Sequence, residues 1–294
     1  MKTILISGSS GFIAENFIKN FAHKYKFIKL SHTKSVSDHV TLEELSANLD
    51  YIKNVDGILN LAGANIATKR WSNKRKQELI SSRVDTTTAL VELANKYNPK
   101  IHFISASAIG IYPTDEQYDE SFFIDYSKYD NFSQEITRKW EQSLLTYQGK
   151  LTIARFGVVL SENGGAFPKM LQPFKMFVGG EIGGGEQFFT WIAMSDLFSA
   201  IELVIENTLI GTYNLTAPQA IRNKDVSKAI AKIWHRPNLL PMPSFMVKLL
   251  FGQMGEELFL NSLNILPTKL MNLNFKFKYP DFIQCIRAIK NQEF

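Results

Sequence analysis

The strongest chemical signal in the chain is a glycine turn close to the N-terminus. The apolar run Ile4–Ile6 leads into Gly8-Ser9-Ser10-Gly11, and a helix-patterned segment follows at once. Glycines let the backbone turn sharply and let phosphate oxygens approach, while the free N–H groups of a helix N-terminus attract anions. We therefore expect a dinucleotide pyrophosphate here rather than a merely structural turn, with these contact residues: Gly8, Ser10, Gly11, Phe12 and Ile13.

The residues that follow the second expected strand, Lys26 to Leu30, indicate whether the site prefers NAD(H) or NADP(H). An NAD-selective site places an Asp or Glu there, about 20 residues after the turn, on the ribose hydroxyls. This chain instead reads Ser31, His32, Thr33, Lys34, with no acid before Asp38. Ser31, His32 and Lys34 can donate to a 2′-phosphate, which favours NADP(H). The alternative is that these are ordinary exposed loop residues.

Strand-like and helix-like segments alternate over the first half of the chain, which predicts an α/β Rossmann-type, doubly wound parallel sheet. We assign 1–160 to an NADP-binding Rossmann domain, with the sheet completed by parts of 188–218. The expected crossover helices cover about 12–24 and 72–96. The expected strands are these: Lys2 to Ser7, Lys26 to Leu30, Asp56 to Leu61, Lys100 to Ser105 and Leu151 to Phe156.

Glycine dominates the next part of the chain, with Asn163-Gly164-Gly165 followed by Gly179 to Gln187. We expect 161–187 to form a glycine-rich loop that folds over the site. A proline-punctuated stretch, Arg236 to Pro243, then leads into 236–294, for which we expect a smaller, mainly helical C-terminal domain that takes part in substrate binding.

Composition narrows the class of protein. Of 294 residues 45% are hydrophobic, the formal net charge is +5, and Cys285 is the single cysteine, which excludes an intrachain disulfide and favours a cytoplasmic location. No window approaches the roughly 20 apolar residues of a membrane span, so we expect no membrane partner. The five histidines show no metal-ligand spacing, and we expect no metal site.

One dense basic run, Lys69 to Lys76, stands out from the dispersed charges. It is compatible with a solvated helix start, with a nearby anionic ligand, or with a nucleic-acid patch. Neither an aromatic stacking platform nor a recognised nucleic-acid fold accompanies it, so we expect no nucleic-acid partner.

A family resemblance covers nearly the whole chain. It begins at Asn60-Leu61-Ala62-Gly63-Ala64-Asn65 and continues through Ser105-Ala106-Ser107, Trp140-Glu141, Arg155-Phe156-Gly157-Val158 and Tyr213 to Pro218. With these motifs the chain resembles an atypical branch of the extended short-chain dehydrogenases/reductases, the uncharacterised NAD(P)-binding "epimerase family" with a C-terminal domain of unknown function.

The resemblance implies cofactor contacts beyond the glycine turn. Leu61, Ala62 and Gly63 would lie along the bridging phosphates and ribose, and Ser31 and His32 at the adenosine end, although the family more often has arginine at His32. It also implies that Glu78 and Arg83 face the cofactor, the alternative being an exposed ion pair, and that Val158 meets the nicotinamide.

The same resemblance bears on catalysis. Extended reductases use a Ser or Thr, a Tyr that acts as acid/base, and a Lys four residues later. Ser107 occupies the serine position, but Ser133 and Thr137 stand where Tyr and Lys are expected. Tyr112, Tyr126 and Tyr129 lie near enough in sequence to supply a rearranged acid.

Two functions follow. The first is an NADP(H)-dependent oxidoreductase or epimerase acting on an unidentified small carbonyl or sugar-like substrate, with Ser107 polarising the carbonyl. The alternative is a non-catalytic NADP(H)-binding sensor or regulatory protein. The apolar runs Phe245 to Phe251 and Leu258 to Leu263 are typical of core or of a homodimer surface.

Overall fold

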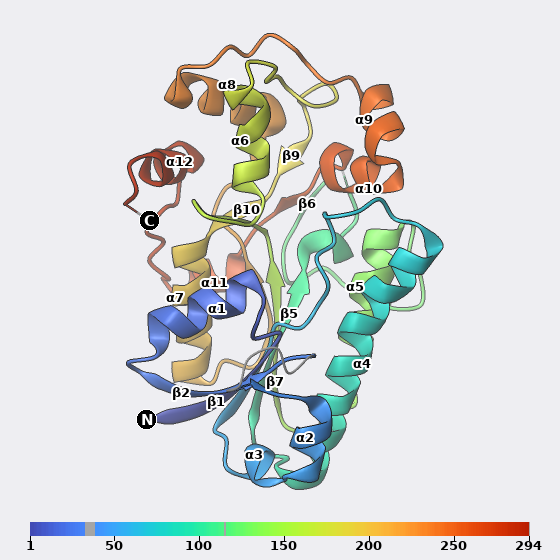
Figure 1. Ribbon diagram of the computed structural model, residues 1–294, viewed down its shortest axis with the longest axis vertical. Helices are drawn as coiled ribbons and strands as arrows, with labels where there is room; N and C mark the ends of the chain where they lie inside the picture. Colours follow the sequence, from blue (N-terminus) through green and yellow to red (C-terminus); the bar gives the residue numbers. More distant parts are fainter. Residues whose placement is uncertain (33–38, 115, 294) are drawn as a thin grey trace.

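The computed structural model describes residues 1–32, 39–114 and 116–293, and a parallel sheet forms its centre (Figure 1). Within these ranges seven strands pair in the order β11-β7-β5-β4-β1-β2-β3. The strand order reverses between β1 and β4, as in a doubly wound Rossmann fold, so the predicted fold class is confirmed. The strands are β1 (Lys2–Ser7), β2 (Tyr25–Leu30), β3 (His39–Val40), β4 (Gly57–Asn60), β5 (His102–Ala108), β7 (Lys150–Phe156) and β11 (Gly211–Leu215).

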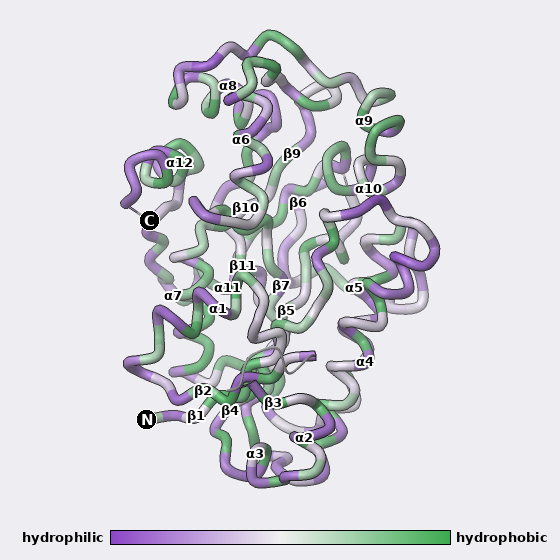
Figure 2. The backbone as a smooth tube through the Cα atoms, in the orientation of Figure 1, coloured by the Kyte–Doolittle hydropathy of each residue, from purple (hydrophilic) through white to green (hydrophobic). Residues whose placement is uncertain are grey.

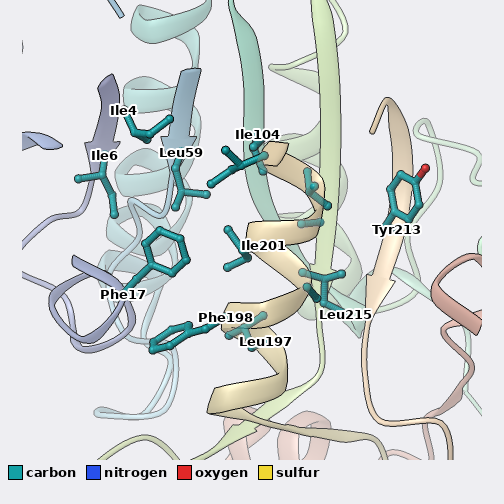
Figure 3. Close-up of a cluster of buried hydrophobic side chains, with 14 of the residues drawn as sticks. Ile4, Ile6, Phe17, Leu59, Ile104, Leu197, Phe198, Ile201, Tyr213 and Leu215 are labelled. Atoms are coloured by element: carbon teal, nitrogen blue, oxygen red, sulfur yellow. The ribbon is translucent and has the colours of Figure 1, made fainter. Parts of the chain in front are cut away.

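Both faces of the sheet are buried, because apolar side chains point alternately to one face and the other along each strand. Ile4 and Ile6 of β1 join one apolar cluster, and Leu5 joins the cluster on the opposite face, because successive strand residues point to opposite sides. Figure 3 shows the first cluster, in which Phe17 and Phe198 pack against the strands. Helices α1 (Phe12–Phe21) and α7 (Met194–Asn207) cover that face. The other carries α2 (Leu42–Ala47), α3 (Asp50–Lys53), α4 (Asn73–Tyr97) and α5 (Phe132–Gln142).

A second, smaller body lies beyond the carboxyl ends of the strands, in the upper half of Figure 1. Its apolar core joins α6 (Phe167–Lys175), α8 (Asn223–Trp234) and α12 (Phe282–Lys290). Short strand pairs lie beneath these helices. They are β8 (Val158–Leu160) with β10 (Trp191–Ala193), and β9 (Phe188–Phe189) with β12 (Ile221–Arg222).

The C-terminal segment 244–294 also contacts the Rossmann body. It comprises α9 (Ser244–Phe251), α10 (Gln253–Gly255), the π-helical turn η2 (Glu256–Leu260), β13 (Asn264–Ile265), α11 (Thr268–Asn272) and α12. Strand β13 pairs with β6 (Gln117–Tyr118), which follows the 3₁₀ turn η1 (Ile109–Ile111). The carboxylate of Asp196 on α7 accepts the backbone N–H groups of Lys278 and Tyr279, at 2.6 and 2.9 Å. The two bodies are therefore interleaved.

The segment 161–187, expected to be one glycine-rich loop, holds helix α6. Pro168 lies in its first turn, where the missing N–H costs no hydrogen bond, and Pro173 lies inside it. Hydrogen bonds to other parts of the chain hold the rest of the segment in place. Gly183 donates its N–H to Met242 O at 2.9 Å, and the Gln187 amide donates to the carbonyls of Ile182 and Phe259, both at 2.9 Å.

A buried histidine at the amino end of β5 makes stability depend on pH. The proton of the Thr152 hydroxyl goes to Leu209 O, so the Thr152 oxygen accepts from His102 Nε2–H at 2.7 Å. Burial lowers the pKa of His102 to about 4. An unfolded histidine titrates at about 6.5, so below that pH the unfolded chain binds more protons and stability falls as pH falls.

We predict that His102→Gln, whose amide can still donate to Thr152, flattens this dependence. Urea unfolding from pH 7 to pH 4 should show wild type losing up to about 3 kcal/mol more than the variant. His23→Gln, at an exposed histidine, is the matched control and should follow wild type. Parallel curves for wild type and His102→Gln would contradict the assignment.

Candidate dinucleotide site

The glycine turn between β1 and α1 is held against the segment that follows β4. Gly8 has φ +64°, and a Cβ at this position would lie 2.7 Å from the carbonyl oxygen of Leu61 and 2.9 Å from Ala62 Cα. Gly11 closes the turn by donating its N–H to Gly8 O at 2.8 Å. The structure thus brings Gly8, Gly11, Leu61 and Ala62 together, as the sequence predicted from separate motifs.

Helix α1 opens directly onto this turn. Its N-cap, Gly11, has no side chain to cap the helix, so the N–H groups of Phe12, Ile13 and Ala14 have no acceptor within the helix. Such a bare N-terminus carries a partial positive charge and is suited to a phosphate. The ring of Phe12 lies against Gly164, where a Cβ would come within 2.4 Å of the ring. The first part of the glycine-rich segment therefore touches the turn, and Ser10 beside it is exposed.

A buried polar network fixes the carboxyl ends of the central strands. Ser7 of β1 donates to the Asn60 side-chain oxygen at 2.5 Å, and the Asn60 amide donates to Thr87 of α4 at 2.8 Å and to Ser105 of β5 at 3.1 Å. Ser7 Oγ in turn accepts the N–H of Leu61 at 3.1 Å. Because buried polar groups are costly unless paired, this network defines where the chain after β4 lies. The sequence analysis did not identify it.

Arg83 on α4 places its guanidinium next to the chain after β4. Its guanidinium donates to the carbonyls of Leu79 and Ala64, at 3.0 and 3.1 Å, and stacks on the Trp140 ring at 5.2 Å. Among the described residues no carboxylate pairs with it. Burial, reinforced by the charge of Arg75, lowers the pKa of Arg83 to about 10. The group touches Gly63, where a Cβ would lie 3.0 Å from Arg83 Cζ, so the positive charge sits directly beneath the chain after β4.

Glu78 is predicted to face the cofactor, with an ion pair to Arg83 as the alternative, and its observed partner is Arg75. Its carboxylate bonds Arg75 at 2.6 Å and is largely exposed. That hydrogen bond lowers the pKa of Glu78. Arg75 is itself buried and donates to Asn65 O at 2.5 Å. The pair orders the start of α4 and the loop before it, while Arg83 remains free of acid.

The other residues predicted to contact the cofactor lie just after β2 and at the start of β8. Ser31 is buried just after β2 and donates its N–H to Val40 O at 2.9 Å, and His32 lies beside it at the surface. Lys34 and Asp38 lie outside the described residues. Val158 begins β8, a strand paired with β10, and its N–H bonds Thr190 O at 3.0 Å.

Ser107, the predicted catalytic serine, belongs to a closed buried network. Its hydroxyl donates to Glu141 Oε1 at 2.6 Å, and Arg155 holds both oxygens of that carboxylate at 2.8 Å. Burial acts to lower the pKa of Arg155, but Glu141 and Tyr112 raise it above its ordinary value, so the guanidinium stays charged. The Ser107 hydroxyl therefore already donates its proton to Glu141, and its oxygen is placed to accept a further hydrogen bond rather than to donate one.

The three tyrosines considered as a rearranged acid are poorly placed for that role. Tyr112 is buried, and its hydroxyl lies between Arg155 and Asn214, at 2.8 and 2.9 Å. Tyr126 donates to Glu141 at 2.8 Å, and burial together with that carboxylate raises its pKa. Tyr129 is exposed. Neither buried hydroxyl resembles a tyrosine acid activated by a neighbouring lysine.

The carboxylate of Glu257, from η2, lies at the N-terminal end of α5. Ser133, at the position expected for the tyrosine of an extended reductase, is one of its partners. The buried carboxylate accepts the backbone N–H groups of Phe132 and Ser133, at 3.1 and 2.7 Å, and the Ser133 hydroxyl at 2.7 Å. Gln253 donates a further bond at 2.7 Å. Thr137 bonds back to Ser133 O. No sequence signal marks Glu257, because it is more than 120 positions from Phe132 and Ser133.

A metal centre is not part of this arrangement. Within the described ranges no group of three or more His, Cys, Asp or Glu side chains could hold a metal ion. Cys285 is buried, and burial raises the pKa of its thiol.

The sheet with its glycine turn, bare helix N-terminus and facing guanidinium defines a dinucleotide-binding protein of the Rossmann class. Comparison with protein families agrees. The chain belongs to the NAD-dependent epimerase/dehydratase family, whose model matches residues 4–215, and a domain of unknown function (DUF1731) matches 242–289. The resemblance inferred from the sequence motifs is confirmed.

Relatives align with nearly the whole of this chain. An epimerase family protein of Staphylococcus aureus is 33% identical, over 95% of this chain and 96% of that protein. The crystal structure of human epimerase family protein SDR39U1 (isoform 2) with NADPH superposes with a TM-score of 0.89 and 26% identity, covering 98% of this chain and 99% of that one. A nucleoside-diphosphate sugar epimerase from Corynebacterium glutamicum gives 0.78 and 26%, covering 98% and 57%.

We predict that Gly8→Ala destabilises the protein and weakens dinucleotide binding. The positive φ alone costs about 1 to 3 kcal/mol for a residue with a Cβ, and the clash with Leu61 displaces the chain after β4. Chemical denaturation and calorimetric titration with NADPH measure the two effects. Gly184→Ala is the control, since a Cβ there meets nothing within 4 Å. If both variants unfold and bind like wild type, the close approach is not required.

Proposed function

We propose that this protein binds NADP(H) across the carboxyl ends of β1, β4 and β5, and acts as an oxidoreductase or epimerase on a small carbonyl or sugar-like substrate. The observation that carries the binding proposal is Arg83, a part-buried guanidinium without a carboxylate among the described residues. It lies next to Gly63, in the chain that the glycine turn contacts at Leu61 and Ala62. A cation in such a place is stabilised by an anionic ligand.

The residues present fit a dinucleotide in a definite orientation. Phe12 and Ile13 would donate their N–H groups to the pyrophosphate, and Arg83 would meet its charge from the opposite side, below Gly63. Ser31 and His32 would lie at the adenosine end and Val158 at the nicotinamide end.

The preference for NADP(H) over NAD(H) is supported by two observations. Neither Ser31 nor His32 is an acid that would repel a 2′-phosphate, and the human relative was crystallised with NADPH. When bound, the nicotinamide ring supplies hydride transfer. This chain's own contribution is to orient the cofactor and to hold the Ser107–Glu141–Arg155 network next to β8.

The substrate class is supported by the family and by a neighbour. The family description covers epimerases and dehydratases, and the Corynebacterium relative is named a nucleoside-diphosphate sugar epimerase. In the present geometry Ser107 would accept a hydrogen bond from a substrate hydroxyl and pass its own proton toward Glu141, at 2.6 Å. That differs from the carbonyl-polarising role that the sequence alone indicated.

A second candidate function is an NADP(H)-binding sensor without turnover. It is favoured by the positions of Ser133 and Thr137, whose hydroxyls bond Glu257 and the backbone, and by the commitment of the Ser107 proton. In this function the cofactor would act as the signal rather than as a reagent.

We predict that Arg83→Met, which keeps an apolar stem against Trp140, lowers NADPH affinity by about 10- to 100-fold, the size of a lost charge-assisted hydrogen bond. Calorimetric titration with NADPH and NADH measures it. A larger loss for NADPH places the guanidinium at the 2′-phosphate, and equal losses place it at the bridging phosphates. Arg287→Met, at an exposed arginine of α12, is the control and should bind normally.

The two functions are separated by turnover. An enzyme should reduce bound NADP⁺ with a panel of hydroxyl compounds and nucleotide sugars, and Ser107→Ala should slow that reduction by about 100-fold or more while leaving NADPH affinity unchanged. A protein that binds NADPH at micromolar concentration, yet reduces NADP⁺ no faster with Ser107 than without, supports the sensor. Failure to bind either dinucleotide would remove the basis for both.

A further inference from the structure

Helix α9 projects from the C-terminal body with its apolar side chains in solvent. Of its eight residues only Val247 is buried, while Phe245 is 68% exposed and Leu249 71%. Met246 and Leu250 are exposed as well. Figure 2 shows this helix in the green of apolar residues, at the outer end of the molecule. A soluble surface rarely gathers large apolar side chains in this way unless they contact something.

The segment before the helix extends the same surface. Leu239 is 77% exposed and Leu240 is exposed beside it. Both donate their backbone N–H groups to Gly179 O at 3.2 Å, which brings them next to Val178, itself exposed. The apolar surface therefore runs from the end of α6 across the linker to α9.

A cluster of cations borders α9 on the side of the Rossmann body. A Cβ on Gly252, the residue after α9, would lie 3.0 Å from the guanidinium of Arg70, and Lys76 donates to Gln253 of α10 at 2.6 Å. These contacts place the basic run beside the helix, as Figure 1 shows. Lys69, Arg70 and Lys74 are exposed and form no ion pair with any described residue. The cation of α9 itself, Lys248, pairs with Glu256 at 2.6 Å.

We propose that α9 and this cationic cluster together form a docking surface for an anionic lipid bilayer. Exposed Phe and Leu side chains can enter the boundary between headgroups and acyl chains, while lysines and arginines next to them attract acidic headgroups. Each signal alone gives weak binding, and the two combined give stable but reversible attachment. The sequence predicted no membrane partner because no segment is long enough to span a bilayer, but a surface contact requires no spanning segment. No helix in the described part of the chain could cross a bilayer.

A second copy of the chain fits this surface less well. In a two-fold contact through α9, the same patch meets itself, so the Lys69, Arg70 and Lys74 clusters of both copies would border one interface. Like charges brought together without intervening acids repel. A membrane with acidic headgroups offers the complementary charge instead.

Vesicle co-sedimentation tests the proposal on the full chain. We expect binding to phosphatidylcholine vesicles that contain phosphatidylglycerol, weak binding to pure phosphatidylcholine, and release in high salt as the charges are screened. Leu249→Asp should lower the partition coefficient at least about tenfold. The double variant Lys69→Ser/Lys74→Ser should lower it by about fivefold per cation.

Two matched controls change the same chemistry elsewhere. Ile210→Asp alters an exposed apolar side chain between α7 and β11, and Lys19→Ser removes an exposed cation of α1. Both should bind vesicles like wild type, and thermal unfolding midpoints should show that all variants are folded.

Three outcomes would overturn the proposal. They are no binding to acidic vesicles at low salt, equal binding to neutral and acidic vesicles, and a dimer in light scattering that Leu249→Asp converts to a monomer. The last would assign α9 to a second copy.

Discussion

The dinucleotide site depends on a contact that leaves no room for a side chain. The backbone at Gly8 and the carbonyl of Leu61 approach so closely that even a methyl group would overlap. Ser7 and Asn60, one residue before each of these positions, are joined by a buried hydrogen bond that keeps the two strand ends in register. The turn, the open start of α1 and the chain above Arg83 all take their positions from this contact.

Charge is balanced differently at the two ends of the site. Around Ser107, the side chains of Arg155 and Glu141 pair with each other, and Ser107, Tyr112 and Tyr126 hydrogen-bond to that pair. Arg83, in contrast, has only carbonyl oxygens and an aromatic face as partners among the described residues. Desolvating a guanidinium without a counterion is unfavourable, so an anion bound beside Arg83 would be stabilised there. Anion binding is therefore a stronger deduction from this structure than catalysis.

Short-range sequence patterns predicted part of the fold and of the candidate site. The strand, glycine turn and helix around Gly8 form a contiguous signal, and the apolar strands follow from short-range patterning. Helix α6 was missed because Pro168 and Pro173 indicate loop in a glycine-rich context, although the first turn of a helix tolerates proline. The roles of Asn60, Arg155 and Glu257 could not be deduced from spacing, since each depends on partners brought together only by the folded sheet.

The replacement of the usual tyrosine and lysine on α5 belongs to a wider rearrangement. Gly110 lies against Ser133, where a Cβ on the glycine would be 3.4 Å from the serine Cβ, so the helix and the turn after β5 pack closely. Glu257 then closes the N-terminus of α5 with three hydrogen bonds to Phe132 and Ser133. A carboxylate at that terminus also compensates the helix dipole. The C-terminal body is thereby joined to the helix that carries the acid/base in extended reductases, and the same helix carries Glu141, the hydrogen-bond partner of Ser107.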